Sequence, residues 1–129
     1  MSSILLMTDS PEIDFDHLNL YVGGDADLTR EVFSLFRNQV EMWGKGLTAD
    51  ADDEIWASVT HSLKGSARAV GAMNLAEACE KAEALTGDDR RPGAREVTVE
   101  LLEQRIDRVL DEISRWEYID DMRRLRSSK

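Results

Sequence analysis

The chain has 129 residues, the length of one ordinary domain, and hydrophobic residues make up 42% of it, enough for a core. It carries 16 Lys and Arg against 26 Asp and Glu, and the net charge of −10 argues against binding to nucleic acid or to anionic lipid. A single cysteine, Cys79, excludes an intramolecular disulfide and a cysteine-cluster metal site. The early apolar run Ile4–Met7 is too short to span a bilayer, so we expect a cytoplasmic protein with no membrane partner.

Two helices are predicted in the first part of the chain. Residues 12–22 predict a short helix that begins at Ser10-Pro11 or Asp14 and ends before Gly23. Asp25 or Asp27 caps a longer helix, from 26 to the high forties, whose end Gly44 and Gly46 weaken. The apolar positions of this second helix recur at three- and four-residue steps: Leu28, Val32, Leu35, Phe36, Val40, Trp43 and Leu47.

Three stripes of apolar residues predict three further helices. The first follows the acidic cluster 50–54 and ends at Gly71; the second is expected to start with an Asn74–Glu77 capping box and to end at Gly87. The third stripe, near the C-terminus, has the narrow spacing of a bundle helix. The three stripes comprise Ile55, Val59, Leu63, Ser66, Ala67 and Val70; Leu75, Ala78, Cys79, Ala82 and Leu85; and Val99, Leu102, Ile106, Val109, Ile113 and Trp116.

The helical pattern predicts an all-α protein. No segment shows the alternation of a β-strand, and the four longer helices are joined by short links. We therefore expect an antiparallel up-down-up-down four-helix bundle, with the short extra N-terminal helix lying across one end or side. Residues 1–11 are assigned to an N-terminal arm, expected to be flexible, and residues 12–126 to a single helical domain.

One face of the third predicted helix combines a histidine with cations. His61 lies about 200° around the helix from Leu63, so it points outward if Leu63 points inward. Lys64, Gly65 and Arg68 follow at i+3, i+4 and i+7 and share its face. Residues 55–76 contain no acid although the chain has 26, so a basic patch lies on an acidic protein and would attract an anionic group such as phosphate.

An exposed imidazole on a cationic face suits phosphoryl transfer. A neutral imidazole nitrogen is a good nucleophile, and Lys64 and Arg68 could neutralise the oxygens of the transferred group. Gly65 costs helix stability, which points to a need for clearance beside the ring. The second ring nitrogen needs an acceptor that fixes its proton; Glu83 and Glu80 on the next helix, and the neutral Gln39, are the candidates.

These residues resemble a known family. The run His61-Ser62-Leu63-Lys64-Gly65-Ser66-Ala67, followed by Gly71-Ala72 and Leu75-Ala76, resembles the histidine-containing phosphotransfer (HPt) domain of bacterial multistep phosphorelays. The pattern His-x-x-Lys-Gly with a glycine six residues later is intact, and Cys79 and Glu83 are similar to that family's next helix. The resemblance spans residues 12–116, and its distinctive part is 61–83.

The resemblance implies a phosphocarrier without kinase activity. His61 would accept a phosphoryl group from the aspartyl phosphate of a receiver domain, such as that of a response regulator or of a hybrid histidine kinase, and pass it to another receiver. Mg²⁺ would belong to the receiver, and the chain itself would need no cofactor or metal; it shows no Walker loop or nucleotide-binding glycine box. By the same resemblance the first two helices would dock the receiver, with Phe15, Leu18 and Tyr21 as contacts. We expect a monomer.

Two other interpretations remain open. The bundle could be an interaction module that binds a receiver domain or another regulator without using His61. It could also be the dimerisation and phosphoacceptor helices of a sensor kinase, but those normally have an acid directly after the histidine and a proline soon after. Here Ser62 follows His61, and residues 62–72 contain no proline. The second histidine, His17, has no convincing partner and is read as a surface residue.

Overall fold

The protein is an all-helical bundle in the computed structural model, which describes residues 11–127. Nothing in this range is a β-strand, which confirms the predicted fold class. The elements are α2 (Phe15–Val22), α3 (Ala26–Gly44), α4 (Asp53–Ala69), α5 (Met73–Glu83), the short 3₁₀ helix η1 (Gly87–Asp89) and α6 (Ala94–Ser127). Within the described residues, no helix is both long and apolar enough to cross a membrane. Of the predicted arm, residues 1–10 lie outside the described range.

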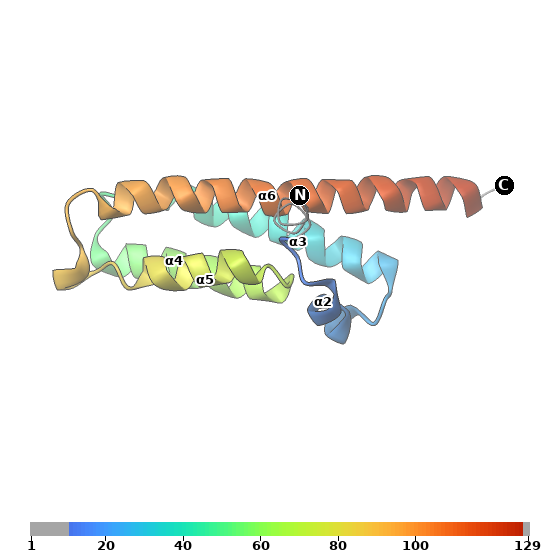
Figure 1. Ribbon diagram of the computed structural model, residues 1–129, viewed down its shortest axis with the longest axis horizontal. Coiled ribbons are helices and arrows are strands. Elements are labelled where there is room, and N and C mark those ends of the chain that lie inside the picture. The colour runs from blue at the N-terminus through green and yellow to red at the C-terminus, as the bar shows by residue number, and fades with distance from the viewer. Residues whose placement is uncertain (1–10, 128–129) are drawn as a thin grey trace, which may run out of the picture.

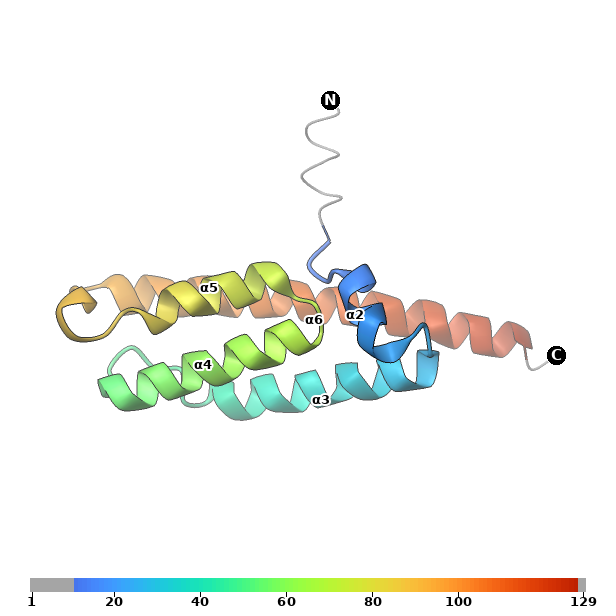
Figure 2. The ribbon, with the colours of Figure 1, turned by 90° about the horizontal axis from the view of Figure 1, so that it is seen from below.

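Helices α3, α4, α5 and α6 alternate in direction, as expected for an up-down-up-down bundle (Figures 1 and 2). Helix α6 is 34 residues long and runs past the far end of the α4–α5 pair. The short helix α2 lies beyond that end, beside the first half of α3. The extra N-terminal helix thus covers one end of the α4–α5 pair.

Aspartate side chains fix the starts of three helices. Each accepts a hydrogen bond from a backbone N–H three residues later and satisfies a donor that has no partner inside the helix. The pairs are Asp14 with His17, Asp25 with Leu28, and Asp52 with Ile55. Of the alternatives raised for the first two helices, Asp14 and Asp25 are therefore the caps.

Four predicted helix boundaries are wrong. Helix α2 begins at Phe15 rather than at residue 12, because the cap is Asp14, and α3 ends at Gly44 rather than in the high forties. The Asn74–Glu77 capping box does not form: α5 starts after Ala72, without a side-chain cap, so Asn74 already lies inside the helix. Helix α5 also ends at Glu83, and Gly87 begins η1 instead of closing α5.

The buried faces differ from the predicted stripes at several positions, of which four involve large side chains of α3 and α4. Leu35 and Ile55 are about half exposed, whereas Phe33 and Trp56, which the stripes omitted, are fully buried. The apolar stripe of α3 is wider than the face it buries, so spacing alone did not identify its centre. In α4 the indole of Trp56 is buried because its N–H finds a buried acceptor, the carbonyl of Ala82, at 2.7 Å. The α6 stripe is confirmed from Leu102 to Ile113.

The turn between α4 and α5 is closed by Gly71. Its φ is +79°, and the N–H groups of Gly71 and Ala72 donate to the carbonyls of Arg68 and Ala67, the pairing of a Schellman turn. The N–H of Asp14 donates to the carbonyl of Gly71 at 2.8 Å, so the segment that leads into α2 is attached to this turn. A Cβ on Gly71 would lie 2.7 Å from the carbonyl oxygen of Asp14. No other residue type fits without displacing that segment.

Replacing Gly71 by alanine should therefore destabilise the fold for two reasons, strained backbone and the clash with Asp14. The matched control is Gly93→Ala, because Gly93 has a similar φ of +83° but open space around its Cβ position. We expect Gly93→Ala to lower the free energy of unfolding by about 1–2 kcal/mol and Gly71→Ala by about 3–5 kcal/mol. Urea unfolding measures both; equal losses would show that the contact with Asp14 carries no energy.

Candidate functional site

The imidazole of His61 projects from the middle of α4 into solvent. Its side chain is 68% exposed, while Leu63, two residues on, is fully buried. The two orientations follow from the helical period, as the sequence indicates. A large macromolecule can therefore reach the ring without any rearrangement of the fold.

Glu83 joins His61 and Lys64 across the seam between α4 and α5. Its Oε2 lies 3.2 Å from Nδ1 of His61, and its Oε1 accepts a hydrogen bond from Nζ of Lys64 at 2.8 Å. Among the acceptor candidates, Glu80 instead approaches Arg68 at 3.9 Å, and Gln39 makes no hydrogen bond to the ring in the described part of the chain. Glu83 is thus the carboxylate that faces the imidazole.

Lys64 lies nearer the protein body than its place on the helix suggested. The side chain is only 12% exposed, because it leans across the seam to reach Glu83. The hydrogen bond from Lys64 lowers the pKa of the Glu83 carboxyl, with a smaller contribution from His61. Glu83 is accordingly ionised at neutral pH and can only accept hydrogen bonds.

The contact with Glu83 decides which nitrogen of the ring is free. An ionised carboxylate accepts, so in the neutral imidazole Nδ1 carries the proton that is donated to Glu83. Nε2 then keeps its lone pair, on the side of the ring away from Glu83. Nε2, the nucleophilic nitrogen, therefore faces away from the protein while Glu83 holds the opposite side of the ring.

Gly65 and Arg68 complete the exposed face. A Cβ added at Gly65 would meet nothing within 4 Å, so close helix packing does not explain this glycine. The absent side chain leaves bare backbone one turn from His61. Arg68, one turn further, is 54% exposed and has only the long 3.9 Å contact with Glu80, so its guanidinium remains available to an incoming anion.

The three residues expected to dock a receiver lie in different environments. Leu18 is fully buried, so its assignment as a docking contact is wrong: it faces the core from α2. Phe15 is half-buried and packs edge-on against Phe33, whereas Tyr21 is 66% exposed. Leu20, which is 78% exposed, is not among the predicted contacts because it does not follow the apolar spacing of its neighbours.

Neither Cys79 nor His17 forms a second functional site. Burial raises the pKa of the Cys79 thiol to about 12, so this cysteine is an inert part of the core. His17 contacts the ring of Tyr21 edge-on at 5.3 Å. In residues 11–127 no group of three or more His, Cys, Asp or Glu side chains is arranged to hold a metal ion.

Comparisons with known proteins identify a family and a similar fold. The family model described as Hpt domain matches residues 27–116, which include every residue of the exposed site. The fold is similar to the crystal structure of the histidine phosphotransferase ShpA from Caulobacter crescentus, with a TM-score of 0.71 and 31% sequence identity. That alignment covers 88% of this chain and 98% of the other. A search of curated proteins finds no match.

The Glu83 contact predicts a pH dependence of stability. A carboxyl whose pKa is lowered in the folded state contributes stability above its ordinary value of 4.5, and that contribution is lost as the pH falls through the folded pKa. We expect Glu83→Gln to lose up to about 1 kcal/mol at pH 7, a difference from wild type that shrinks below pH 4.5. The matched control is Glu80→Gln, whose partner is 3.9 Å away. Urea titrations at pH 3–7 test this; a constant difference would contradict it.

Proposed function

This chain belongs to the Hpt domain family, whose members carry phosphoryl groups in phosphorelays, and we propose that His61 is its phosphoacceptor. In this proposal His61 takes the group from the aspartyl phosphate of a receiver domain and passes it reversibly to the aspartate of another. The observation that carries the proposal is the exposed ring whose Nδ1 lies 3.2 Å from Glu83. That contact leaves Nε2 free on an open surface.

The transfer step uses Nε2 as the nucleophile. Its lone pair attacks phosphorus in line with the bond to the aspartyl oxygen; the N–P bond forms, the P–O bond breaks, and the aspartate leaves as a carboxylate. The ring becomes positively charged because Nδ1 keeps its proton, and the Glu83 carboxylate faces that charge. Lys64 and Arg68 supply positive charge near the phosphoryl oxygens. The reverse sequence returns the group to a receiver.

The remaining chemistry would come from the partner. Mg²⁺ and the acceptor aspartate would belong to the receiver domain, whether a response regulator or the receiver of a hybrid histidine kinase, and this chain would need no cofactor. It would neither bind ATP nor phosphorylate itself. Because α4 and α5 of one chain supply the whole site, the protein would act as a monomer. Its proposed location is the cytoplasm. The exposed Tyr21 and half-buried Phe15 of α2 are the proposed apolar contacts with the receiver.

The first test is the identity of the labelled residue. With a ³²P-labelled receiver domain as donor, wild-type protein and the control His17→Gln should be labelled, and His61→Gln should not, with unchanged circular dichroism. The label should resist alkali and be lost in acid, as expected of a phosphoramidate. Equal labelling of His61→Gln would exclude His61 as the acceptor. A stable complex with the receiver but no label would instead favour a non-transferring interaction module.

The second test concerns clearance beside the ring. Gly65→Ala should raise the free energy of unfolding by about 0.5–1 kcal/mol, because the position is helical and open. The same methyl group should slow transfer by roughly tenfold, because it keeps the donor from reaching the ring closely. Gly44→Ala, at the end of α3, adds a methyl group to equally open space away from His61 and should leave the rate unchanged. Transfer by Gly65→Ala at the wild-type rate would refute the clearance argument.

A further inference from the structure

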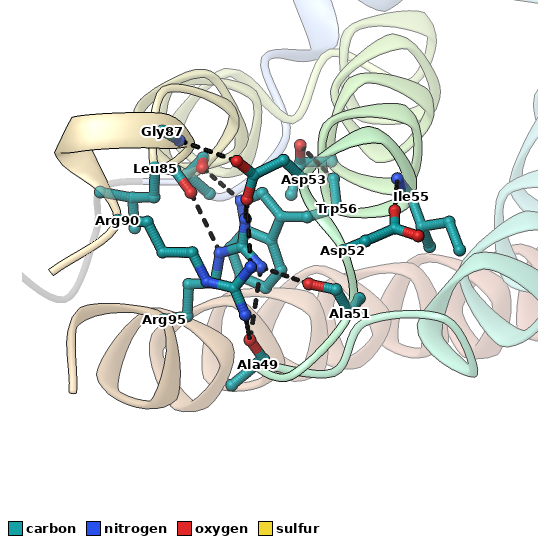
Figure 3. Close-up of polar contacts among 12 residues, drawn as sticks. Ala49, Ala51, Asp52, Asp53, Ile55, Trp56, Leu85, Gly87, Arg90 and Arg95 are labelled. Carbon is teal, nitrogen blue, oxygen red and sulfur yellow. Dashed lines mark hydrogen bonds and ion pairs between the residues drawn. The ribbon is translucent and has the colours of Figure 1, made fainter. Parts of the chain in front are cut away.

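A buried arginine and a buried tryptophan meet at the end of the bundle opposite α2 (Figure 3). Arg95, in the first turn of α6, is 2% exposed, and its guanidinium lies 4.5 Å from the centre of the Trp56 ring. Trp56, in the first turn of α4, is fully buried. Neither residue lies on the exposed face of His61, and no step of the transfer reaction uses them.

The Arg95 guanidinium joins three segments. It donates to the carbonyls of Ala49 and Ala51 before α4, to Oδ1 of Asp53, and through Nε to the carbonyl of Leu85 at 3.0 Å. The backbone N–H of Gly87 and then the side chain of Arg90 also bind Asp53, and together with Arg95 they lower the pKa of its carboxyl. The Arg95 guanidinium, on which the Trp56 ring packs, is therefore held by the loop before α4, by the first turn of α4 and by the residue two beyond α5.

Trp56 and Arg95 both bind carbonyls at the C-terminal end of α5. The indole N–H donates to the carbonyl of Ala82 at 2.7 Å, and Arg95 takes that of Leu85. The carbonyl of Ala82 also accepts the backbone N–H of Leu85 at 3.0 Å, in the turn that ends α5, and Leu85 itself lies two residues beyond the helix. Between the two bonded residues lies Glu83, the last residue of α5.

Glu83 lies at the C-terminal end of α5, and the ends are the least stable parts of a helix. Helix ends fray, and α5 has only 11 residues. Yet its carboxylate has to meet two atoms of α4 at once, at 3.2 Å and 2.8 Å. The Gly71 turn fixes the other end of α5 against α4. Trp56 belongs to the same helix as His61, so its bond to Ala82 fixes α5 directly against the helix that carries the imidazole.

We propose that Trp56 is a positioning residue for the phosphotransfer site: its indole N–H, with Arg95 behind the ring, holds the last turn of α5 so that Glu83 faces His61 and Lys64. The inference rests on the function proposed above and extends it to a residue that touches neither His61 nor an incoming phosphoryl group. It predicts that loss of a single buried N–H changes which nitrogen of His61 carries the proton.

The test compares Trp56→Phe with Trp43→Phe. Phenylalanine keeps an aromatic ring over Arg95 but removes the N–H, and Trp43 is a half-buried tryptophan of α3. The ¹⁵N shifts of the neutral His61 ring should show mainly the Nδ1–H form in wild type and Trp43→Phe, with the Nε2–H form increased in Trp56→Phe. The initial rate of phosphate uptake by Trp56→Phe should fall roughly tenfold. Both readouts are taken well below the thermal unfolding transition.

A purely structural role would give a different result. Trp56→Phe would then unfold at lower temperature but keep the wild-type tautomer and rate, and this outcome would overturn the inference. If Trp56→Phe does not fold, Trp56→3-benzothienylalanine, in which sulfur replaces the N–H in a ring of the same shape, decides by the same two readouts. Should wild-type protein take up no phosphate, the proposed function fails, while the tautomer comparison still tests the role of Trp56.

Discussion

The contact of one carboxylate with two side chains of α4 is the interaction on which the site depends. Glu83 binds Nδ1 of His61 through one oxygen and Nζ of Lys64 through the other. Lys64 keeps the carboxyl ionised, and the ionised carboxyl fixes the ring with Nε2 outward. An exposed histidine would otherwise rotate and exchange tautomers freely. The His61 side chain is thereby both exposed to solvent and held in one orientation.

The bundle serves this contact by fixing α5 against α4 at both ends. At one end the Gly71 turn is attached to the segment before α2, which excludes any side chain there. At the other end Trp56 binds the carbonyl of Ala82 in the last turn of α5, and Arg95 binds that of Leu85 just beyond the helix. Between these ends, Gly65 leaves open backbone beside the ring. The fold therefore holds the ring and its partner in place and leaves the approach to the ring unobstructed.

The sequence predicts this molecule well where one helix decides the outcome and less well where two helices meet. The period of α4 places His61 opposite Leu63, and capping chemistry offers Asp14 and Asp25, each with one alternative that the structure then excludes. Spacing could not choose between Glu83, Glu80 and Gln39, because the register of α5 against α4 depends on tertiary contacts. The same limit explains why Leu18 was assigned to the surface and Trp56 was left out of the core. On a short helix the spacing fits either the core or the surface for an apolar residue such as Leu18. For Trp56, the buried acceptor of the indole N–H lies 26 residues away in the chain. From its own helix Lys64 is predicted to be a solvent-facing cation, because its partner, Glu83, belongs to α5.

The position of the phosphoryl group on the ring tests the account most directly. Protein labelled with ¹⁵N in its histidine rings is phosphorylated by a receiver domain, and the one-bond coupling between ³¹P and ¹⁵N identifies the substituted nitrogen. Because Glu83 occupies the Nδ1 side, the phosphoryl group should be on Nε2 of His61, with Nδ1 still protonated. A phosphoryl group on Nδ1 would mean that the ring does not react in the orientation set by Glu83, and the proposed mechanism would be wrong.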